Sequence, residues 1–220
     1  GVCDGLTAAA FVETAKLKAG DRLIVVGRKA HALGRGAAYA EDTEETPWRY
    51  AYLLNSPADD IDPAFAAWLV DNWDSIRSRM EGRQPDWLAA AQPLLERGDT
   101  YGLNVPRSFY GDFIVERMES VLRAFRDAGV EVQLINDTAL SLEPTDGLTL
   151  RTDGGMSIDA DSVDIAPGGP TTQRFDGDDG PFSAPILFGN EDRIADHIRQ
   201  GGEITCIGAN ATMLDTLRLC

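Results

Sequence analysis

Two periodicities of apolar residues follow each other near the start of the chain. From 7 to 17 the apolar positions recur at the spacing of a helix, and 23–26 is a short, fully aliphatic run. Such a run is typical of a strand that is buried on both faces of a parallel sheet. We therefore predict a helix over 7–17 and a strand over 23–26. The stretch 28–58 shows neither periodicity, and irregular segments of this length are usually functional or disordered.

The middle of the chain carries helical patterns. Asp62 and Pro63 predict the start of a helix. The aspartate side chain can accept a hydrogen bond from an N–H group of the first turn, and the N–H group that proline lacks would have no partner in the helix at this position. Large apolar residues then recur at helical spacing as far as Ile76. Such a stripe is more typical of a core than of a cofactor contact. Further helices are predicted over 85–96 and 107–128.

Beyond Gly129 the pattern changes to that of strands. Short apolar segments separated by glycine-containing turns predict strands over 130–134, 139–143, 148–151, 156–158 and 162–166. The middle three are expected to form an antiparallel meander inserted between strands of a parallel sheet. The chain then carries a predicted helix over 191–200, a strand over 204–207 and a glycine turn over 208–215 that leads into a final helix. This alternation predicts an α/β fold.

The first ten residues carry a broken nucleotide-binding fingerprint. Gly1 and Gly5 precede the predicted helix, and the N–H groups at such a helix start bind a pyrophosphate. Counted back from Gly5, the glycine that allows close approach of the pyrophosphate should stand at Val2. Either one residue is inserted and Gly1 is that glycine, or the turn has lost it. A complete fingerprint has an apolar strand before this turn, so we expect that the chain is truncated at its start. We expect a second truncation after the strand, glycine turn and helix that begin at 204.

The composition restricts the partners. The chain has 36 acidic and 20 basic residues, a formal net charge of -16 and a pI near 4.4. A surface of this sign repels duplex nucleic acid and anionic membranes. The chain is 43% hydrophobic but shows no long apolar run and no signal-peptide pattern. We therefore expect a cytoplasmic globular protein with no nucleic-acid partner and no membrane partner.

The residues that commonly bind metals are scattered. The cysteines and histidines are Cys3, Cys206, Cys220, His31 and His197. They form no C-x-x-C pair and no cluster of metal-ligand spacing. The acidic run 176–180 has its alternate oxygen ligands out of step with a calcium loop. We therefore expect neither a metal site nor a disulfide framework.

Several ordered segments resemble one protein family. Residues 33–39, 53–58 and 104–111 resemble the blocks G-R-G-x-A-Y, L-L-N-x-P-A and V-P-R-x-x-[FY]-G of the FAD-NAD(P)-binding flavoproteins. Residues 164–170 resemble the segment that closes the FAD domain of that family, and 208–215 resemble the start of its NAD(P)-binding half. The group is similar to flavin-dependent urate hydroxylases, aspartate N-monooxygenases and N-hydroxylating monooxygenases. Ordered blocks are more specific than a lone glycine motif.

The resemblance implies a fold and its cofactors. The fold is a Rossmann-like FAD/NAD(P)-binding three-layer fold with an inserted antiparallel β-meander, incomplete at both termini. An FAD-binding domain, without its first strand, would occupy 1–190, and the start of an NAD(P)-binding half would occupy 191–220. FAD and NAD(P)H are the implied cofactors, and the choice between NADH and NADPH stays open.

The resemblance also implies a set of cofactor-binding residues, which are Gly1, Gly5, Arg28, Gly34, Arg35, Gly36, Asn55, Gly168 and Gly208. Glycines let the backbone approach a planar or phosphate-bearing ligand, and Arg35 offers a fork of donors to a pyrophosphate. Asn55 would present an amide to a flavin edge or to a substrate. Arg107 is either an anion ligand or a structural link between a helix and a loop. No catalytic residue is assigned.

Several positions depart from the pattern of the family. Gly27 stands where a carboxylate usually takes the adenosine ribose hydroxyls at the end of the second strand. Arg28 and Lys29 follow it, and this pair fits either a phosphate site or solvated loop charges. Pro167 replaces the usual threonine. In the glycine turn over 208–215, Asn210 stands where the glycine that allows close approach of the cofactor is expected. Each change weakens a predicted contact with an adenine dinucleotide.

Three functional hypotheses follow. The first is a flavin-dependent oxidoreductase of the monooxygenase type, in which FAD reduced by NAD(P)H serves a reaction on a small-molecule substrate. The second is a truncated noncatalytic remnant, whose incomplete sheet would need a homo-oligomer or another partner to cover it. The third is a nucleotide-binding module that senses a ligand without turnover.

Overall fold

The computed structural model describes residues 17–36, 39–41, 53–144, 147–166, 191–206, 213–214 and 216–217. The chain divides into two compact units, and each unit is made of two separate segments of sequence. The first unit comprises Gly1–Ala37 and Ile114–Gly169, and the second comprises Ala38–Phe113 and Pro170–Cys220.

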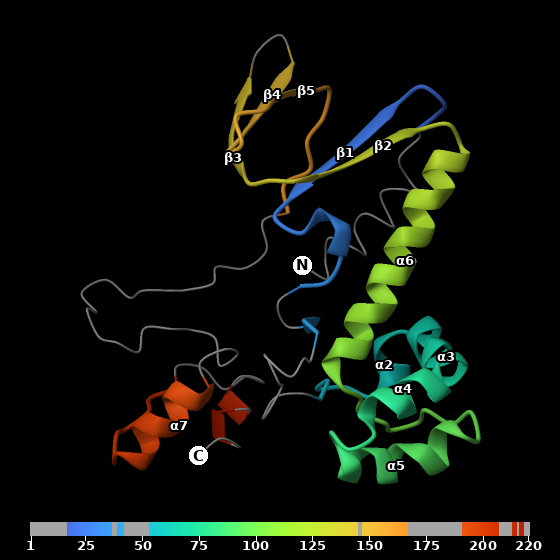
Figure 1. The fold of residues 1–220 in the computed structure, drawn as a ribbon, viewed down its shortest axis with the longest axis vertical. Coiled ribbons are helices and arrows are strands. Elements are labelled where there is room, and N and C mark those ends of the chain that lie inside the picture. Colours follow the sequence, from blue (N-terminus) through green and yellow to red (C-terminus); the bar gives the residue numbers. More distant parts are fainter. Residues whose placement is uncertain are drawn as a thin grey trace. The chain divides into compact units, whose positions relative to one another are not determined.

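A parallel pair of strands forms the centre of the first unit (Figure 1). Strand β1, Arg22–Gly27, pairs with β2, Glu131–Asn136, in a register that aligns Leu23 with Val132. The predicted strand over 23–26 is confirmed, and the strand predicted over 130–134 begins one residue later and continues to Asn136. A parallel pair requires a long crossover connection, and here the crossover ends in helix α6, Arg107–Asp127.

The core of the first unit lies between α6 and one face of this pair. The buried side chains of Leu122, Phe125 and Val130 pack together there. Leu23 and Val132, which are partners in the register, pack against them with half-buried side chains. The apolar face of α6 is therefore the surface on which the β1–β2 pair rests. The helix predicted over 107–128 is confirmed.

Two turns hold the amino-terminal ends of β1 and β2 in register. The N–H group of Gly20 donates to the Gly129 carbonyl at 3.0 Å, and the N–H group of Glu131 donates to the Asp21 carbonyl at 2.9 Å. Gly129 has φ +83°, which favours glycine, and a Cβ there would lie 3.0 Å from the Cβ of Ala19. The glycine that ends the predicted helix is thus required both by its backbone conformation and by the close approach of the other turn.

A second sheet of the first unit is antiparallel. It contains β3, Ala139–Pro144, β4, Leu148–Thr152, and β5, Ser157–Ala160, in the order β3-β4-β5. The prediction of a further strand over 162–166 is wrong, because these residues form no strand. Ile165 is 68% exposed, so this segment lacks the cover on both faces that a parallel-sheet strand needs.

The second unit contains a helical core (Figure 1). The core is formed by α2, Ala58–Ile61, α3, Pro63–Asp71, α4, Trp73–Met80, α5, Pro85–Leu95, and the first part of α6. The unit also contains α7, Glu191–Arg199, which has no buried residue. The predicted helices over 85–96 and 191–200 are confirmed. The strand predicted over 204–207 is wrong for 204–206, which form no strand. Residues 203–206 are all exposed, so nothing covers a strand there.

The helix predicted from Pro63 through Ile76 is two helices, with Asn72 between them. The backbone N–H and the side-chain Nδ2 of Asn72 both donate to the Trp68 carbonyl, the latter at 2.9 Å. The helical hydrogen bonds from Asn72 N to the Trp68 carbonyl and from Ile76 N to the Asn72 carbonyl, both 3.0 Å, are kept. The break therefore lies in the backbone angles of Asn72, φ -101° and ψ 11°, and its side chain adds a second donor to the Trp68 carbonyl. At the other end of α3, Asp62 Oδ1 accepts from Ala64 N at 2.8 Å, which confirms the predicted cap.

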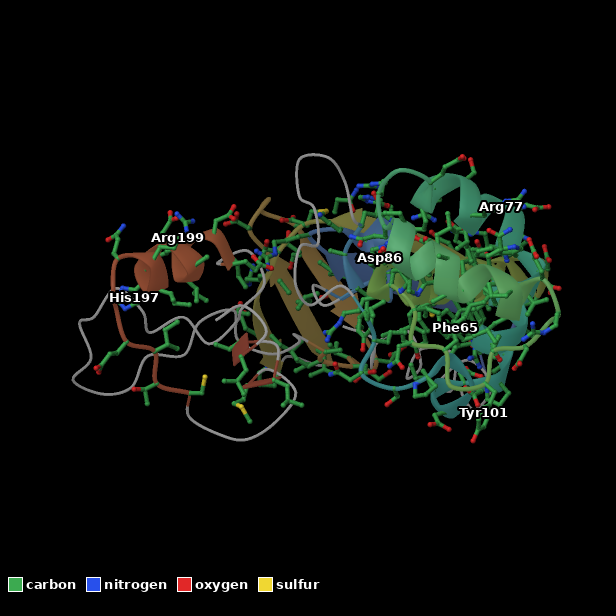
Figure 2. All side chains as sticks on the ribbon, turned by 90° about the horizontal axis from the view of Figure 1, so that it is seen from below. Phe65, Arg77, Asp86, Tyr101, His197 and Arg199 are labelled. Carbon is green, nitrogen blue, oxygen red and sulfur yellow. The ribbon has the colours of Figure 1, made fainter. Side chains whose placement is uncertain are left out.

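Aromatic side chains fill the core of the second unit. The ring of Phe65 lies 5.0 Å from that of Tyr110 and 5.4 Å from that of Phe113, between their centroids. Phe65, Leu69 and Ile76 are among the most completely buried side chains, so the stripe predicted as core is confirmed. Figure 2 shows Phe65 among the helices and Tyr101 pointing outward from the loop after α5, where it is 83% exposed. No helix in the described part of the chain is both long enough and apolar enough to span a membrane.

Candidate functional site

The carboxyl ends of β1 and β2 form one edge of the first unit. The N–H group of Asp137 donates to the Gly27 carbonyl at 3.2 Å, and the N–H group of Ala30 donates to Asn136 Oδ1 at 3.0 Å. The loop that leaves β1 is therefore tied to the end of β2. Parallel sheets bind ligands outside the carboxyl ends of their strands, so this edge is the first place to look for a cofactor.

The end of β1 is open and positively charged. Among the described residues, no atom lies within 4 Å of the position that a Cβ on Gly27 would take, so none of them fills the space next to its backbone. Arg28 and Lys29 follow and are exposed. Within the described residues, neither of these two side chains forms a hydrogen bond or an ion pair. The edge thus offers two free cations in place of the carboxylate that usually binds the ribose.

A single carboxylate joins this edge to the antiparallel sheet. Asp137 Oδ1 accepts from Thr138 N at 2.7 Å, and both carboxylate oxygens accept from Gly154 N, at 3.2 and 3.1 Å. The N–H group of Asp153 also donates to the Thr138 carbonyl at 2.9 Å. The turn between β4 and β5 is therefore fastened to the residues that follow β2.

The hydrogen bonds stabilise the ionised form of Asp137. The largest contribution comes from the side chain of Thr152, followed by the N–H group of Thr138, and the N–H group of Gly154 adds to them. Together they hold the pKa of Asp137 below its ordinary value. A Cβ on Gly154 would lie 2.6 Å from Asp137 Oδ2, so the approach requires a glycine. In the sequence, the glycine pair at 154–155 indicated only a turn and did not point to Asp137.

Two of the segments singled out in the sequence lie next to each other in the second unit. Leu53 and Pro106 form an isolated antiparallel bridge, and the N–H group of Leu54 donates to the Val105 carbonyl at 2.8 Å. Asn104 Nδ2 donates to the Leu54 carbonyl at 2.8 Å. The segments 53–58 and 104–111 therefore form one local structure.

Arg107 links these two segments. Its Nε donates to the Leu53 carbonyl at 2.8 Å, and its Nη2 donates to Asn55 Oδ1 at 3.2 Å. The residue is 8% exposed. Of the two interpretations left open above, the structural link between a helix and a loop is the one that these hydrogen bonds support. Asn55 is exposed, and its amide oxygen faces the guanidinium.

The remaining predicted site residues are distributed as follows. Arg28, Gly34, Arg35 and Gly36 lie in the first unit, Asn55 lies in the second, and Gly1, Gly5, Gly168 and Gly208 fall outside the described residues, as do Val2, Pro167 and Asn210. Gly34 has φ +93°, a backbone conformation that favours glycine. Among the described residues there is no group of three or more side chains suited to a metal ion.

Comparison with known proteins gives one match. The sequence profile of the family described as FAD-NAD(P)-binding matches residues 3–170, which is well over half of the chain. The matched region contains the β1–β2 pair, both segments around Arg107 and the antiparallel sheet. No curated protein and no solved structure matches the chain.

Proposed function

Because the chain belongs to the FAD-NAD(P)-binding family, we propose that it is a flavin-dependent oxidoreductase of the monooxygenase type that acts on a small molecule. FAD and NAD(P)H are its cofactors. The observation that carries the proposal is the family match over 3–170, which takes in a parallel strand pair with an open carboxyl edge. Bound FAD supplies electron transfer and oxygen activation, and the protein supplies binding, orientation and exclusion of water.

The described residues fit the adenosine end of FAD. No described atom crowds the backbone of Gly27, and the exposed cations of Arg28 and Lys29 follow it, which supports a position for the adenosine diphosphate half beside them. In this proposal the two cations favour the ligand through its negative charge, in place of a carboxylate bound to ribose. The same half of the cofactor would be lined by Gly34, Arg35 and Gly36.

The other proposed contacts follow from the predicted set. The pyrophosphate would rest on the turn that contains Gly1 and Gly5, and Gly168 would lie where the chain passes the cofactor. Gly208 would begin the NAD(P)H site. Asn55 would donate its amide N–H group to the flavin edge or to the substrate, because its amide oxygen already accepts from Arg107. Arg107 is then a positioning residue for Asn55.

The direct test is reconstitution of the full chain with FAD. We expect uptake of about one FAD per chain, a flavin absorbance spectrum, and bleaching of that spectrum by NADH or NADPH without oxygen. Readmitted oxygen should restore the oxidised spectrum. A chain that takes up no FAD would contradict the proposal. The relative rates at which NADH and NADPH bleach the flavin show which of them is the reductant.

A nucleotide-binding module without turnover is the second candidate. The observation that favours it is the family match itself, which is to a cofactor-binding family and specifies no reaction. This candidate predicts that the chain binds FAD but that NADH and NADPH do not reduce the bound flavin. Stopped-flow reduction under anaerobic conditions therefore separates the two candidates.

A further inference from the structure

A hollow of about 320 Å³ lies in the first unit, between η1, Ala30–Ala32, the second half of α6 and strand β2. It is lined by none of the residues at the open end of β1, neither Gly27 nor Arg28, and not by Asn136. Pockets for small molecules typically measure about 300–1,000 Å³, so the hollow is large enough for a small organic ligand. The hollow therefore adjoins the proposed cofactor edge and shares Ala30 with it, but neither of the two cations of that edge lines it.

The floor of the hollow is aliphatic. It is formed by side chains that include Leu33, Met118, Leu122 and Leu134. Met118 and Leu122 belong to the core, whereas Leu134 is 37% exposed although it lies on the same face of β2 as the packed Val132. A ligand that fills the hollow would cover this exposed leucine, so the ligand should have an apolar body.

The rim of the hollow is charged. Arg123 and Arg126 stand one turn apart on α6, both are exposed, and both line the hollow. Neither forms an ion pair or a hydrogen bond with any residue that the structure describes. This is unexpected in a chain with 36 acidic and 20 basic residues, in which carboxylates are in excess. Two like charges at this spacing repel each other, and an anion between them would relieve that repulsion.

The other polar groups of the rim form no ion pair with the arginines. Glu119 precedes Arg123 by one turn and forms no ion pair with a described residue, and His31 enters from η1. Guanidinium groups bind carboxylates through paired N–H donors, which gives such a pair both strength and direction. The floor thus favours an apolar group, and the rim favours an anionic group, so a ligand that carries both at opposite ends would match the hollow.

We propose that this hollow binds an aliphatic carboxylate, with its hydrocarbon chain on the floor and its carboxylate on Arg123 and Arg126. An inorganic phosphate would satisfy the arginines but would leave the aliphatic floor in contact with water. An uncharged hydrocarbon would cover the floor but would leave the arginines without an anion. The site does not depend on the proposed oxidoreductase activity, because none of its residues belongs to the proposed cofactor set.

The test is calorimetric titration of the full chain with octanoate. We expect one site per chain and an affinity that falls as salt is added, because the arginines are exposed. Octanol, which has the same chain without the charge, should bind at least about tenfold more weakly. Failure of octanoate to bind, or equal binding of octanol, would overturn the proposal.

Variants locate the site. Arg123→Gln and Arg126→Gln should each weaken octanoate binding by about tenfold, and Glu119→Gln should strengthen it. Leu134→Ser tests the floor independently and should also weaken binding. The matched control is Arg22→Gln, which removes an exposed arginine of the same unit outside the hollow and should leave the affinity unchanged.

Two results would refute the assignment to this hollow. One is an Arg123→Gln, Arg126→Gln double variant that keeps the affinity of the unaltered chain while its circular dichroism spectrum shows native helix content. The other is complete loss of octanoate binding when FAD saturates the chain, because the hollow would then be part of the cofactor site. Equal affinity with and without FAD supports a separate site.

Discussion

Asp137 shows how much one residue contributes to the first unit. It follows β2 directly, its carboxylate accepts from the turn between β4 and β5, and its own N–H group donates to Gly27. The parallel pair and the antiparallel sheet are hydrogen-bonded together at this point. Because Gly27 ends β1, the same residue also helps to fix the edge at which we place the adenosine half of FAD.

The ionised form of Asp137 should stabilise the fold in a pH-dependent way. Its pKa is lowered in the folded state, so its contribution is fully present above the ordinary pKa of an aspartate, about 3.9, and is lost as the pH falls through the lower folded-state pKa. Asp137→Asn should lower the melting temperature at neutral pH, and the difference from the unaltered chain should shrink in acid. Thermal unfolding followed by circular dichroism across this range measures it.

Asp153→Asn is the control for this prediction. Asp153 lies in the same turn, but only its backbone N–H group makes a hydrogen bond there. Its substitution should leave the melting temperature and its pH dependence close to those of the unaltered chain. A difference between Asp137→Asn and the unaltered chain that stays constant from neutral pH into acid would show that the carboxylate acts by some means other than its charge.

Arg107 should contribute more to stability than an exposed arginine. Arg107→Gln removes the donors to the Leu53 carbonyl and to Asn55 Oδ1, and an unpaired buried polar group costs about 1–3 kcal/mol. Arg107→Lys should recover only part of this, because an ammonium cannot reproduce two directed donors. Urea unfolding of the full chain gives the free energies.

Arg97→Gln is the matched control for Arg107. Arg97 is exposed and only 4.0 Å from Asp99 in a surface ion pair, so its loss should change the free energy of unfolding by less than about 0.5 kcal/mol. Equal effects of the two substitutions would mean that the hydrogen bonds of Arg107 do not hold the segments 53–58 and 104–111 together.

At the scale of elements, local signals in the sequence predicted helices better than strands. The start of α3 depends on Asp62, Pro63 and the hydrogen bond from Ala64 N to the Asp62 side chain. All three are close together in sequence, so the cap could be predicted. The break at Asn72 could not, because the apolar spacing continues through it to Ile76. The segments 162–166 and 204–206 have apolar residues but no strand, since a strand depends on a partner that local spacing does not reveal.

The cap of α3 gives a prediction at this scale. Asp62→Ala removes the acceptor for Ala64 N and should lower the free energy of unfolding by about 1 kcal/mol. Asp71→Ala, at the last residue of the same helix, removes a carboxylate from the end where the helix dipole disfavours it and should cause no loss. Chemical denaturation that finds equal losses for both would argue against a capping role for Asp62.

At the scale of the whole molecule, the sequence predicted which segments matter but not how they meet. The order of the blocks resembled one family, and the match over 3–170 confirms the FAD-NAD(P)-binding assignment. The contact between 53–58 and 104–111 depends on Arg107 and Asn104 reaching carbonyl groups far away in sequence. Such contacts are set by tertiary packing. The monooxygenase type and the domain division at 190 stay predictions.

Cofactor binding should stabilise the whole chain. FAD at about a hundred times its dissociation constant should raise the free energy of unfolding by about 2.7 kcal/mol. FMN, which lacks the adenosine half, should raise it much less if that half lies at the carboxyl edge of β1 and β2. Melting temperatures measured with FAD, FMN and neither provide the comparison, and equal shifts with FAD and FMN would place the recognised part of the cofactor elsewhere.

The pairing of Leu23 with Val132 also bears on synthesis by the ribosome. β1 leaves the exit tunnel long before β2 is synthesised. The backbone N–H and C=O groups of β1 that pair with β2 are therefore hydrogen-bonded to water until the intervening helices have been translated. The aromatic partners of α3 at Tyr110 and Phe113 are also translated before β2, so the helices can pack first. The nascent chain therefore completes its helical insert before the strand pair that encloses it in sequence.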